Sequence, residues 1–187
     1  VSFDARMGSA AQLGGGIDTG RTVLDNCFVV DSPQQLLNCR GVVPFHAQTQ
    51  IKLHGSYQLP WDVSVSGIFQ NVGGPEIEAN YQATNAEIAP SLGRDLAACR
   101  GAAVWTTARA SVPLVKPLTL WEDRRTQIDM RVSKRFRLGS TAYVKANVDV
   151  YNLLNGNAVL GLNQNYGAQW QRPSAFISQE AFLQGPN

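Results

Sequence analysis

The sequence contains no run of about 18 consecutive apolar residues, the length that a membrane-spanning helix needs, so a transmembrane helix is excluded. The sequence also lacks a large excess of charge of either sign. The formal net charge is +2, with 16 Lys and Arg against 14 Asp and Glu, which offers no concentrated basic face for a nucleic acid. No basic-then-apolar leader is visible at the start. Because the chain begins inside an alternating run, we expect it to be part of a longer protein.

Residues that support catalysis or metal binding are few. The chain has two histidines and three cysteines, and no Ser/His/Asp set, paired acids or metal-ligand cluster can be recognised. The sequence therefore predicts that the protein is not an enzyme and has no cofactor. The run Gly14-Gly15-Gly16 is not a phosphate-binding loop, because no Lys-Ser/Thr pair follows it. We expect it to relieve curvature or crowding within a strand.

Two of the cysteines, Cys27 and Cys39, lie in one loop-like stretch and are close enough in sequence to close a small ring. A zinc site is the alternative, but the CxxC spacing and a nearby pair of histidines are missing. The pattern favours a disulfide, which forms in an oxidising compartment. It predicts a Cα separation below about 7 Å between Cys27 and Cys39.

The strongest pattern in the chain is a pair of strictly alternating runs between residues 124 and 155, joined by a short turn. Successive side chains of a strand point to opposite faces, so even-numbered residues share one face and odd-numbered residues the other. The even face is apolar except at Thr126 and Lys134, with Ile128, Met130, Val132, Phe136, Leu138, Ala142, Val144, Ala146, Val148 and Val150. The odd face is polar, with Gln127, Asp129, Arg131, Ser133, Arg135, Arg137, Tyr143, Lys145, Asn147, Asp149 and Tyr151.

A soluble antiparallel sheet with one wet face and a transmembrane β-barrel both produce this alternation. Strand length separates them, because soluble strands usually have about 5–6 residues whereas a tilted membrane-spanning strand needs about 9–11. Both runs reach the longer length without a Gly or Pro break. The sequence therefore predicts an all-β fold, an antiparallel meander of long tilted strands that forms part of a transmembrane β-barrel.

The connections between predicted strands alternate in length. We expect one ascending strand from residue 2 that continues toward 22, strands at 48–59 and 63–70, and an extended piece at 76–83 that continues the latter. The connections are then long (23–46), short (60–62), long (84–123), short (139–141) and long (156–172). Outer-membrane barrels have short periplasmic turns and long external loops, so the alternation is typical of them.

Several stretches resemble the C-terminal part of TonB-dependent outer-membrane receptors, in particular receptor-like proteins with an upstream carboxypeptidase-regulatory-like domain. The matching pieces are GSYQLPWDVSVSGIFQNVGGPEIEANY, PSLGRDLAAC, RRTQIDMRVSKRFRLG, VDVYNLLN and NQNYGAQWQRPSAF, which cover most of the chain from about Gln48 onward in the order that the family shows.

The resemblance implies a barrel of about 22 strands plugged by a separate N-terminal domain. Residues 1–187 would supply about the last five or six strands, without the plug. The implied location is the cell outer membrane, and the implied function is energised uptake of a substrate. The implied partners are outer-membrane lipid, the plug, a TonB-type energy-coupling protein and the barrel-assembly machinery.

The residues expected to face the lumen of such a barrel are polar and lie on the polar faces of the predicted strands. They are Gln50, Lys52, His54, Asp129, Arg131, Arg135, Lys145 and Asp149. For any one of them, a role as a plain solvated or salt-bridged wall residue is the alternative to a role at the plug interface or along the translocation path.

Parity predicts the register of the hairpins. Directly opposed residues share a face, so their numbers must both be even or both be odd. A three-residue loop, Gly139-Ser140-Thr141, is the shortest that satisfies this rule. It sets Arg131 opposite Asp149, an attractive pair, and Arg135 opposite Lys145, an unfavourable one. The same rule makes residues 60–62 a three-residue loop, with Leu59 opposite Val63.

A function of another class is also compatible with alternating strands. A soluble or surface-attached β-sandwich that binds a ligand such as a carbohydrate would bury the apolar faces of two sheets against each other. Extraction separates the two hypotheses: partition of the full-length protein into detergent, with heat-modifiable migration, supports the barrel, and recovery in the aqueous fraction contradicts it.

Overall fold

The structure is a computed structural model that describes residues 1–28, 36–99, 108–177 and 180–184. It is mostly β, and all strand pairs within its sheets are antiparallel, which confirms the predicted all-β meander. The main sheet has seven strands in the order β1-β2-β5-β6-β9-β10-β13. Their bounds are β1 Ser2–Met7, β2 Ala11–Asp18, β5 Gln50–Leu59, β6 Val63–Val72, β9 Arg125–Leu138, β10 Ala142–Tyr151 and β13 Glu180–Gln184.

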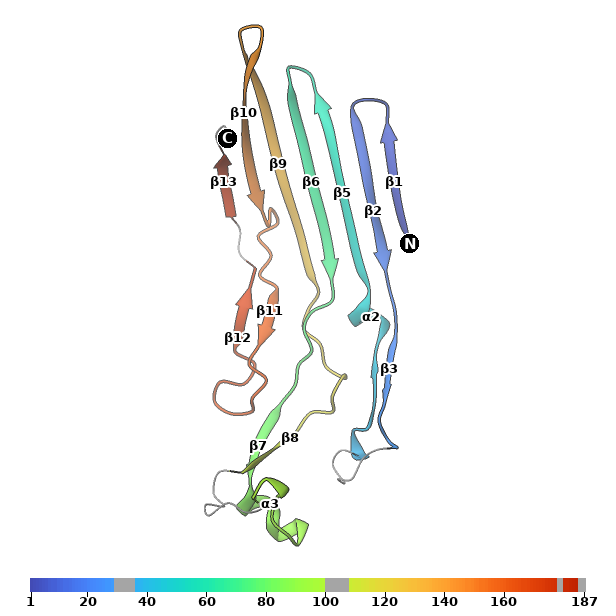
Figure 1. Cartoon of the computed structure of the whole chain (residues 1–187), viewed down its shortest axis with the longest axis vertical. Helices are drawn as coiled ribbons and strands as arrows, with labels where there is room; N and C mark the ends of the chain where they lie inside the picture. The colour runs from blue at the N-terminus through green and yellow to red at the C-terminus, as the bar shows by residue number, and fades with distance from the viewer. Residues whose placement is uncertain (29–35, 100–107, 178–179, 185–187) are drawn as a thin grey trace.

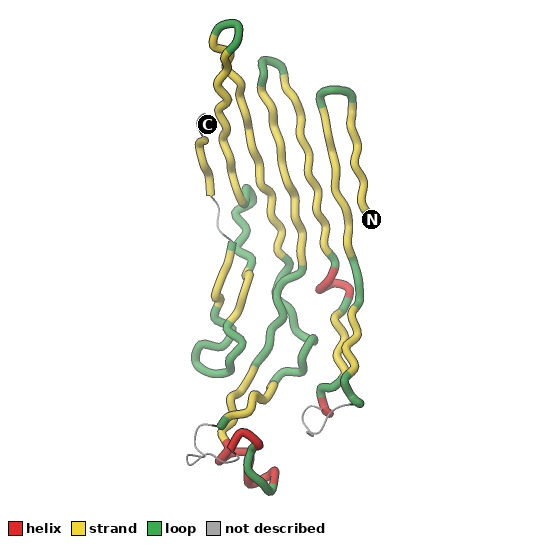
Figure 2. Tube along the Cα trace, in the orientation of Figure 1, coloured by secondary structure: helices red, strands yellow, loops and turns green. Residues whose placement is uncertain are grey.

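Three two-stranded sheets lie in the long connections. They are formed by β3 Thr22–Asp25 with β4 Arg40–Val43, by β7 Asn80–Thr84 with β8 Arg109–Pro113, and by β11 Val159–Leu162 with β12 Pro173–Phe176. The helical elements α2 Phe45–Gln48, α3 Asn85–Leu92 and the 3-10 turn η1 Ala97–Cys99 lie in the same connections (Figure 2). No helix in the described residues is long and apolar enough to cross a membrane.

The short turns and the long connections separate to opposite ends of the sheet (Figure 1). The turns β1–β2, β5–β6 and β9–β10 lie at one end, whereas the small sheets and α3 extend beyond the other. The main sheet is open in the described part of the chain, because β1 pairs with β2 alone and β13 with β10 alone. The described sheet therefore has two edge strands, β1 and β13.

The N-terminal prediction of one ascending strand is wrong. Residues 2–18 form a hairpin in which Met7 pairs with Ala11 across a three-residue turn, and Gly8 adopts the left-handed conformation with φ 63°. Because a three-residue turn preserves parity, the alternation runs through it without a break, and the sequence pattern gave no sign of the reversal. This extra strand is one reason why the sheet has seven strands and not the expected five or six.

Two further expectations about the connections are corrected. The stretch 23–46 was expected to be a loop, but β3 and β4 pair within it, with Asp25 opposite Arg40. The extended piece after β6 does not continue that strand, because β7 pairs with β8 in a separate small sheet. Both small hairpins consist of strands of four or five residues, too short for periodicity to reveal.

The hairpin registers agree with the parity argument. Arg131 pairs with Asp149, Arg135 with Lys145, and Leu59 with Val63. The apolar pairs of the β9–β10 hairpin, from Leu138 with Ala142 to Met130 with Val150, follow the same register. Both three-residue loops are confirmed.

Following the register across the sheet, the apolar residues of successive strands come to one face, here named the apolar face. Its members include Phe3, Ala5, Met7, Leu13, Ile17, Ile51, Leu53, Tyr57, Leu59, Val63, Val65, Phe69, Ile128, Met130, Val132, Phe136, Val144, Val148 and Val150. The other face, here named the polar face, carries the charged and amide side chains. Lys134 is the charged exception on the apolar face, and its ammonium donates to the carbonyl of Trp61 in the adjacent turn.

At one pair of neighbouring residues, burial is inverted relative to a soluble domain. On β10 the apolar Val148 is 42% exposed, whereas its neighbour Asp149 on the polar face is 2% exposed. The buried hydrophobic residues among the described ones are Ala79, Ala83 and Cys99, all of which lie in the long connections. The main sheet is a single layer, and no other described element packs across its apolar face (Figure 1).

The glycine run on β2 is explained by close approach to β5. A Cβ on Gly15 would lie 2.4 Å from the carbonyl oxygen of Lys52 and 2.6 Å from Cδ2 of Leu53. Any larger residue would push the two strands apart. The expectation that the run relieves crowding is confirmed at this position.

Candidate functional site

The candidate site is the polar face of the main sheet. All eight residues expected to face a lumen lie on this one face, with Gln50, Lys52 and His54 on β5, Asp129, Arg131 and Arg135 on β9, and Lys145 and Asp149 on β10. The structure brings Arg131 and Asp149 into contact and sets Arg135 opposite Lys145, whereas the three β5 residues form no side-chain hydrogen bond or ion pair with the described residues.

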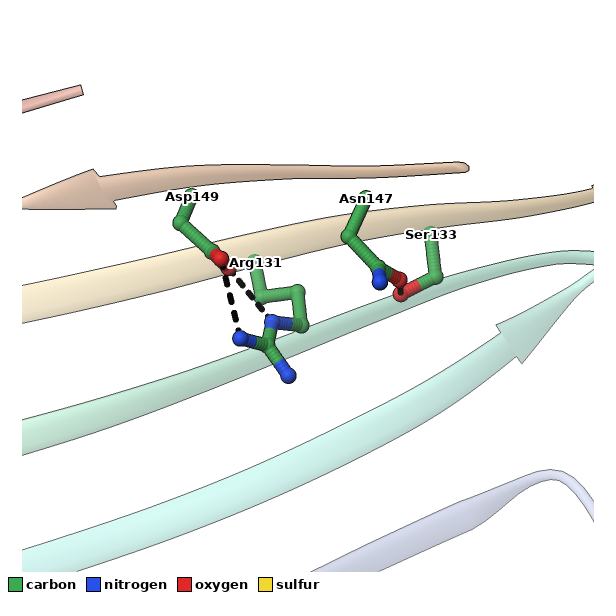
Figure 3. Close-up of polar contacts among 4 residues, drawn as sticks. All are labelled: Arg131, Ser133, Asn147 and Asp149. Carbon is green, nitrogen blue, oxygen red and sulfur yellow. Dashed lines mark hydrogen bonds and ion pairs between the residues drawn. The ribbon is translucent and has the colours of Figure 1, made fainter. Parts of the chain in front are cut away.

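The centre of the polar face is an ion pair between Arg131 and Asp149 (Figure 3). The guanidinium donates through Nε to Oδ1 of Asp149, and through Nη2 to Oδ2 at 2.9 Å. A planar guanidinium and a carboxylate fit together in this two-bond geometry, which fixes both side chains. The Asp149 side chain is 4% exposed and that of Arg131 is 43% exposed, so the carboxylate is covered while the cation remains accessible.

A second polar contact lies one step along the same two strands, where the Ser133 hydroxyl donates to Oδ1 of Asn147 at 2.7 Å (Figure 3). Further toward the turn, Arg135 and Lys145 are directly opposed. The Arg135 guanidinium stacks over the ring of Tyr143, 4.9 Å from its centroid. This stacking orients Arg135 without an acidic partner, so the two cations leave that end of the polar face positively charged.

Asp129 has a structural role that the sequence did not reveal. Its carboxylate accepts from the backbone N–H of Asn152 at 2.8 Å and from the side chain of Gln127 at 2.8 Å. Asn152, 1% exposed, has φ 52° and exchanges two hydrogen bonds with Gly156, so it ends β10 in a left-handed turn. Asp129 thus anchors the turn after β10, which supports a wall role for this residue.

A hollow of about 260 Å³ opens on the sheet where β6, β9 and β10 adjoin. It is lined in part by Ser66, Asp129, Arg131, Asp149 and Tyr151. The lining combines a carboxylate–guanidinium pair and hydroxyl groups with the apolar side chains of Ile68 and Met130. In the described residues no group of three or more His, Cys, Asp or Glu side chains could hold a metal ion.

The long-connection end of the sheet is held by Arg124, a residue that the sequence analysis did not single out. Its Nε donates to Oδ1 of Asn71 at 2.8 Å, its Nη2 to the carbonyl of Thr49 at 2.7 Å, and its Nη1 to the carbonyl of His46. One side chain therefore joins the start of β9 to the end of β6 and to α2, just before β5. The sequence around Arg124 and Arg125 contains no spacing pattern that would predict which of the two joins the strand ends.

The predicted disulfide is present. Cys27 and Cys39 are bonded, with a Cα separation of 4.8 Å, just beyond the paired ends of β3 and β4. The backbone N–H of Asn26 donates to the carbonyl of Cys39 at 2.9 Å, which continues the pairing of the two strands to the bridge.

The residues between β6 and β7 connect the long connections to one another. On one side, Ile77 N–H donates to the Leu120 carbonyl at 3.0 Å; on the other, Asn80 N–H donates to the Gln164 carbonyl at 2.8 Å. The indole N–H of Trp170 also donates to the carbonyl of Glu78 at 2.7 Å. These hydrogen bonds join the connection between β6 and β9 to the connection after β10, although the two lie far apart in the sequence.

The first turn of α3 is stabilised by Glu87. Its carboxylate accepts from the N–H and the hydroxyl of Thr84 at 2.7 and 2.8 Å, and from the hydroxyl of Tyr81 at 2.6 Å. The Tyr81 hydrogen bond, followed by those from Thr84, lowers the pKa of Glu87 to about 2. Because the pKa is lower in the folded state, the carboxylate favours the folded helix above its ordinary pKa of 4.5.

The stability that Glu87 gives to α3 is expected to be complete above pH 4.5 and to disappear as the pH falls toward 2. The protection factors of the amides in residues 85–92, which compare the exchange rate with the intrinsic rate at each pH, should therefore fall across this window in the wild type. In a Glu87→Gln variant the exchange should be faster at pH 7, and this acidic transition should be lost. An unchanged transition in the variant would assign it to another carboxylate.

Comparison of the chain with protein-family models, with curated proteins and with solved structures gives no match.

Proposed function

We propose that this chain is part of the wall of an outer-membrane β-barrel of the TonB-dependent receptor type and serves in energised uptake of a substrate. The observation that carries the proposal is the single-layer sheet, with an apolar face that no described element covers and a polar face that carries most of the charged side chains, among them the Arg131–Asp149 ion pair. Exposed apolar area on this scale disfavours a water-exposed sheet, because each Å² of apolar surface left in water costs about 25 cal/mol. Lipid would remove that cost.

The arrangement of the connections supports the same function. Short turns lie at one end of the sheet, and long connections that are hydrogen-bonded to one another lie at the other (Figure 1). This arrangement matches the asymmetry between the periplasmic and external ends of outer-membrane barrels. The disulfide fits an oxidising, extracytoplasmic compartment. Both open edges of the sheet would be closed by further strands, since unpaired edges have no place in lipid.

In this proposal the apolar face contacts outer-membrane lipid. The polar face contacts water and a plug domain, with the Arg131–Asp149 pair as a wall element and Arg135 and Lys145 as accessible cations. The energy-coupling protein would act through the plug, and the barrel-assembly machinery would insert the strands. The alternative, a ligand-binding β-sandwich, requires a second sheet over the apolar face. The small sheets instead lie beyond the end of the main sheet (Figure 1).

Fractionation of cells that express the full-length protein tests the proposal. We expect the protein in the outer-membrane fraction, extracted only by detergent, and migrating faster on gel electrophoresis when it is not boiled. Recovery in the aqueous fraction without detergent would contradict the proposal and favour the sandwich.

A further inference from the structure

A pocket of about 450 Å³ lies between two long connections, away from the polar face of the sheet. Leu36, Leu37, Cys39 and Arg40 from the disulfide-linked hairpin form one wall, and Lys116 and Leu118 from the connection after β8 contribute to the other. The volume is within the range of about 300–1,000 Å³ that small-molecule sites occupy.

The two walls of the pocket are fixed against each other. A Cβ on Gly41 would lie 2.6 Å from Cδ1 of Leu118, so this leucine packs directly on the hairpin backbone. Leu118 itself has φ 63°, a conformation that costs a non-glycine residue energy, and its N–H donates to the carboxylate of Glu76. The disulfide closes the hairpin on the opposite wall. The pocket is therefore built by long-range contacts and does not depend on one flexible loop.

The lining has one sign of charge. Among the described residues, Arg40 and Lys116 are the charged ones of the lining, both are exposed, and no described carboxylate lines the pocket. Asp25 lies opposite Arg40 in the hairpin register, but its Oδ1 accepts the N–H of Cys27. Leu36 and Leu37 are 50% and 78% exposed, so apolar surface is accessible beside the two cations. Such a lining suits a ligand with both an anionic group and an apolar body.

We propose that this pocket binds a small organic anion, with Arg40 and Lys116 contacting its charged group and the leucines contacting its apolar part. The proposal of anion binding rests on the pocket and does not depend on the proposed function. The role of that anion as the imported substrate, captured at the long-connection end, rests on the proposed function.

Isothermal titration of the full-length protein in lipid nanodiscs tests the binding, with 1-naphthoate as the probe and empty nanodiscs as the blank. Neutral 1-naphthalenemethanol and cationic 1-naphthylmethylammonium have the same ring without the negative charge. We expect 1-naphthoate to bind more tightly than either. Arg40→Gln and Lys116→Gln should each weaken its binding by about tenfold, the effect of losing one hydrogen bond to a charged group.

Arg94→Gln is the matched control, because Arg94 is an exposed cation in the same long connection as Lys116 but outside the lining. Its affinity should equal that of the wild type, and Arg40→Lys should recover part of the loss. Equal binding of the three probes, no binding of 1-naphthoate, or wild-type affinity in both Gln variants would overturn the proposal. Fractionation reports separately on membrane insertion, so failure of the pocket and failure of the barrel can be distinguished.

Discussion

Replacing Leu53 with arginine should lower the free energy of unfolding by about 2–4 kcal/mol, the cost of a cation near the middle of the lipid-facing surface of a barrel. Leu53 is on the apolar face in the middle of β5, paired with Gly15 on one side and Phe69 on the other. If the apolar face were in water, an added charge there would change stability by only about 0.5 kcal/mol. This substitution therefore distinguishes lipid from water on that face.

His54→Arg is the matched control, because it adds a cation at the next residue on the polar face. We expect it to change stability little. Denaturant unfolding of the full-length protein from lipid vesicles measures both variants. Equal effects of Leu53→Arg and His54→Arg would show that the two faces share one environment, which would contradict the barrel.

Replacing Arg124 with methionine should lower the free energy of unfolding by about 2–3 kcal/mol, close to the net contribution of one hydrogen bond to a charged group, because water can solvate the acceptors that lie near the surface. The guanidinium donates to Asn71, Thr49 and His46 from one planar group. Methionine keeps the apolar stem but removes every donor. The strand ends at the long-connection side should then open, so amide exchange should rise there before it rises at the short turns.

Arg137→Met is the control for loss of a cation at the other end of β9. The Arg137 side chain is 72% exposed and its contact with Asp62 is a surface ion pair at 3.2 Å. Surface pairs contribute about 0–1 kcal/mol, so we expect a smaller effect. Arg124→Lys should recover only part of the stability, because an ammonium cannot reach three acceptors in the plane of a guanidinium. A Met variant as stable as the wild type would show that Arg124 does not hold the strand ends together.

The sequence determined the features that depend on parity. In the β9–β10 hairpin, alternation assigned each side chain to a face, and the need to match faces required a three-residue loop and thereby the Arg131–Asp149 pair. The same reasoning gave Leu59 opposite Val63. The short separation of Cys27 and Cys39 was enough to predict their disulfide. Each of these is a local property, since it involves neighbours along one strand, one turn or one small ring.

Only the tertiary structure decided where the chain reverses without a break in parity and which distant segments meet. The turn at residues 8–10 was invisible because Met7 and Ala11 have the same parity. The Arg124 contacts span 53 to 78 residues, and the packing of Leu118 on Gly41 spans two long connections. An alternating pattern records which face a side chain occupies, but it carries no information about the path of an aperiodic connection. That path depends on contacts between distant residues, and it places Arg40 and Lys116 in one pocket.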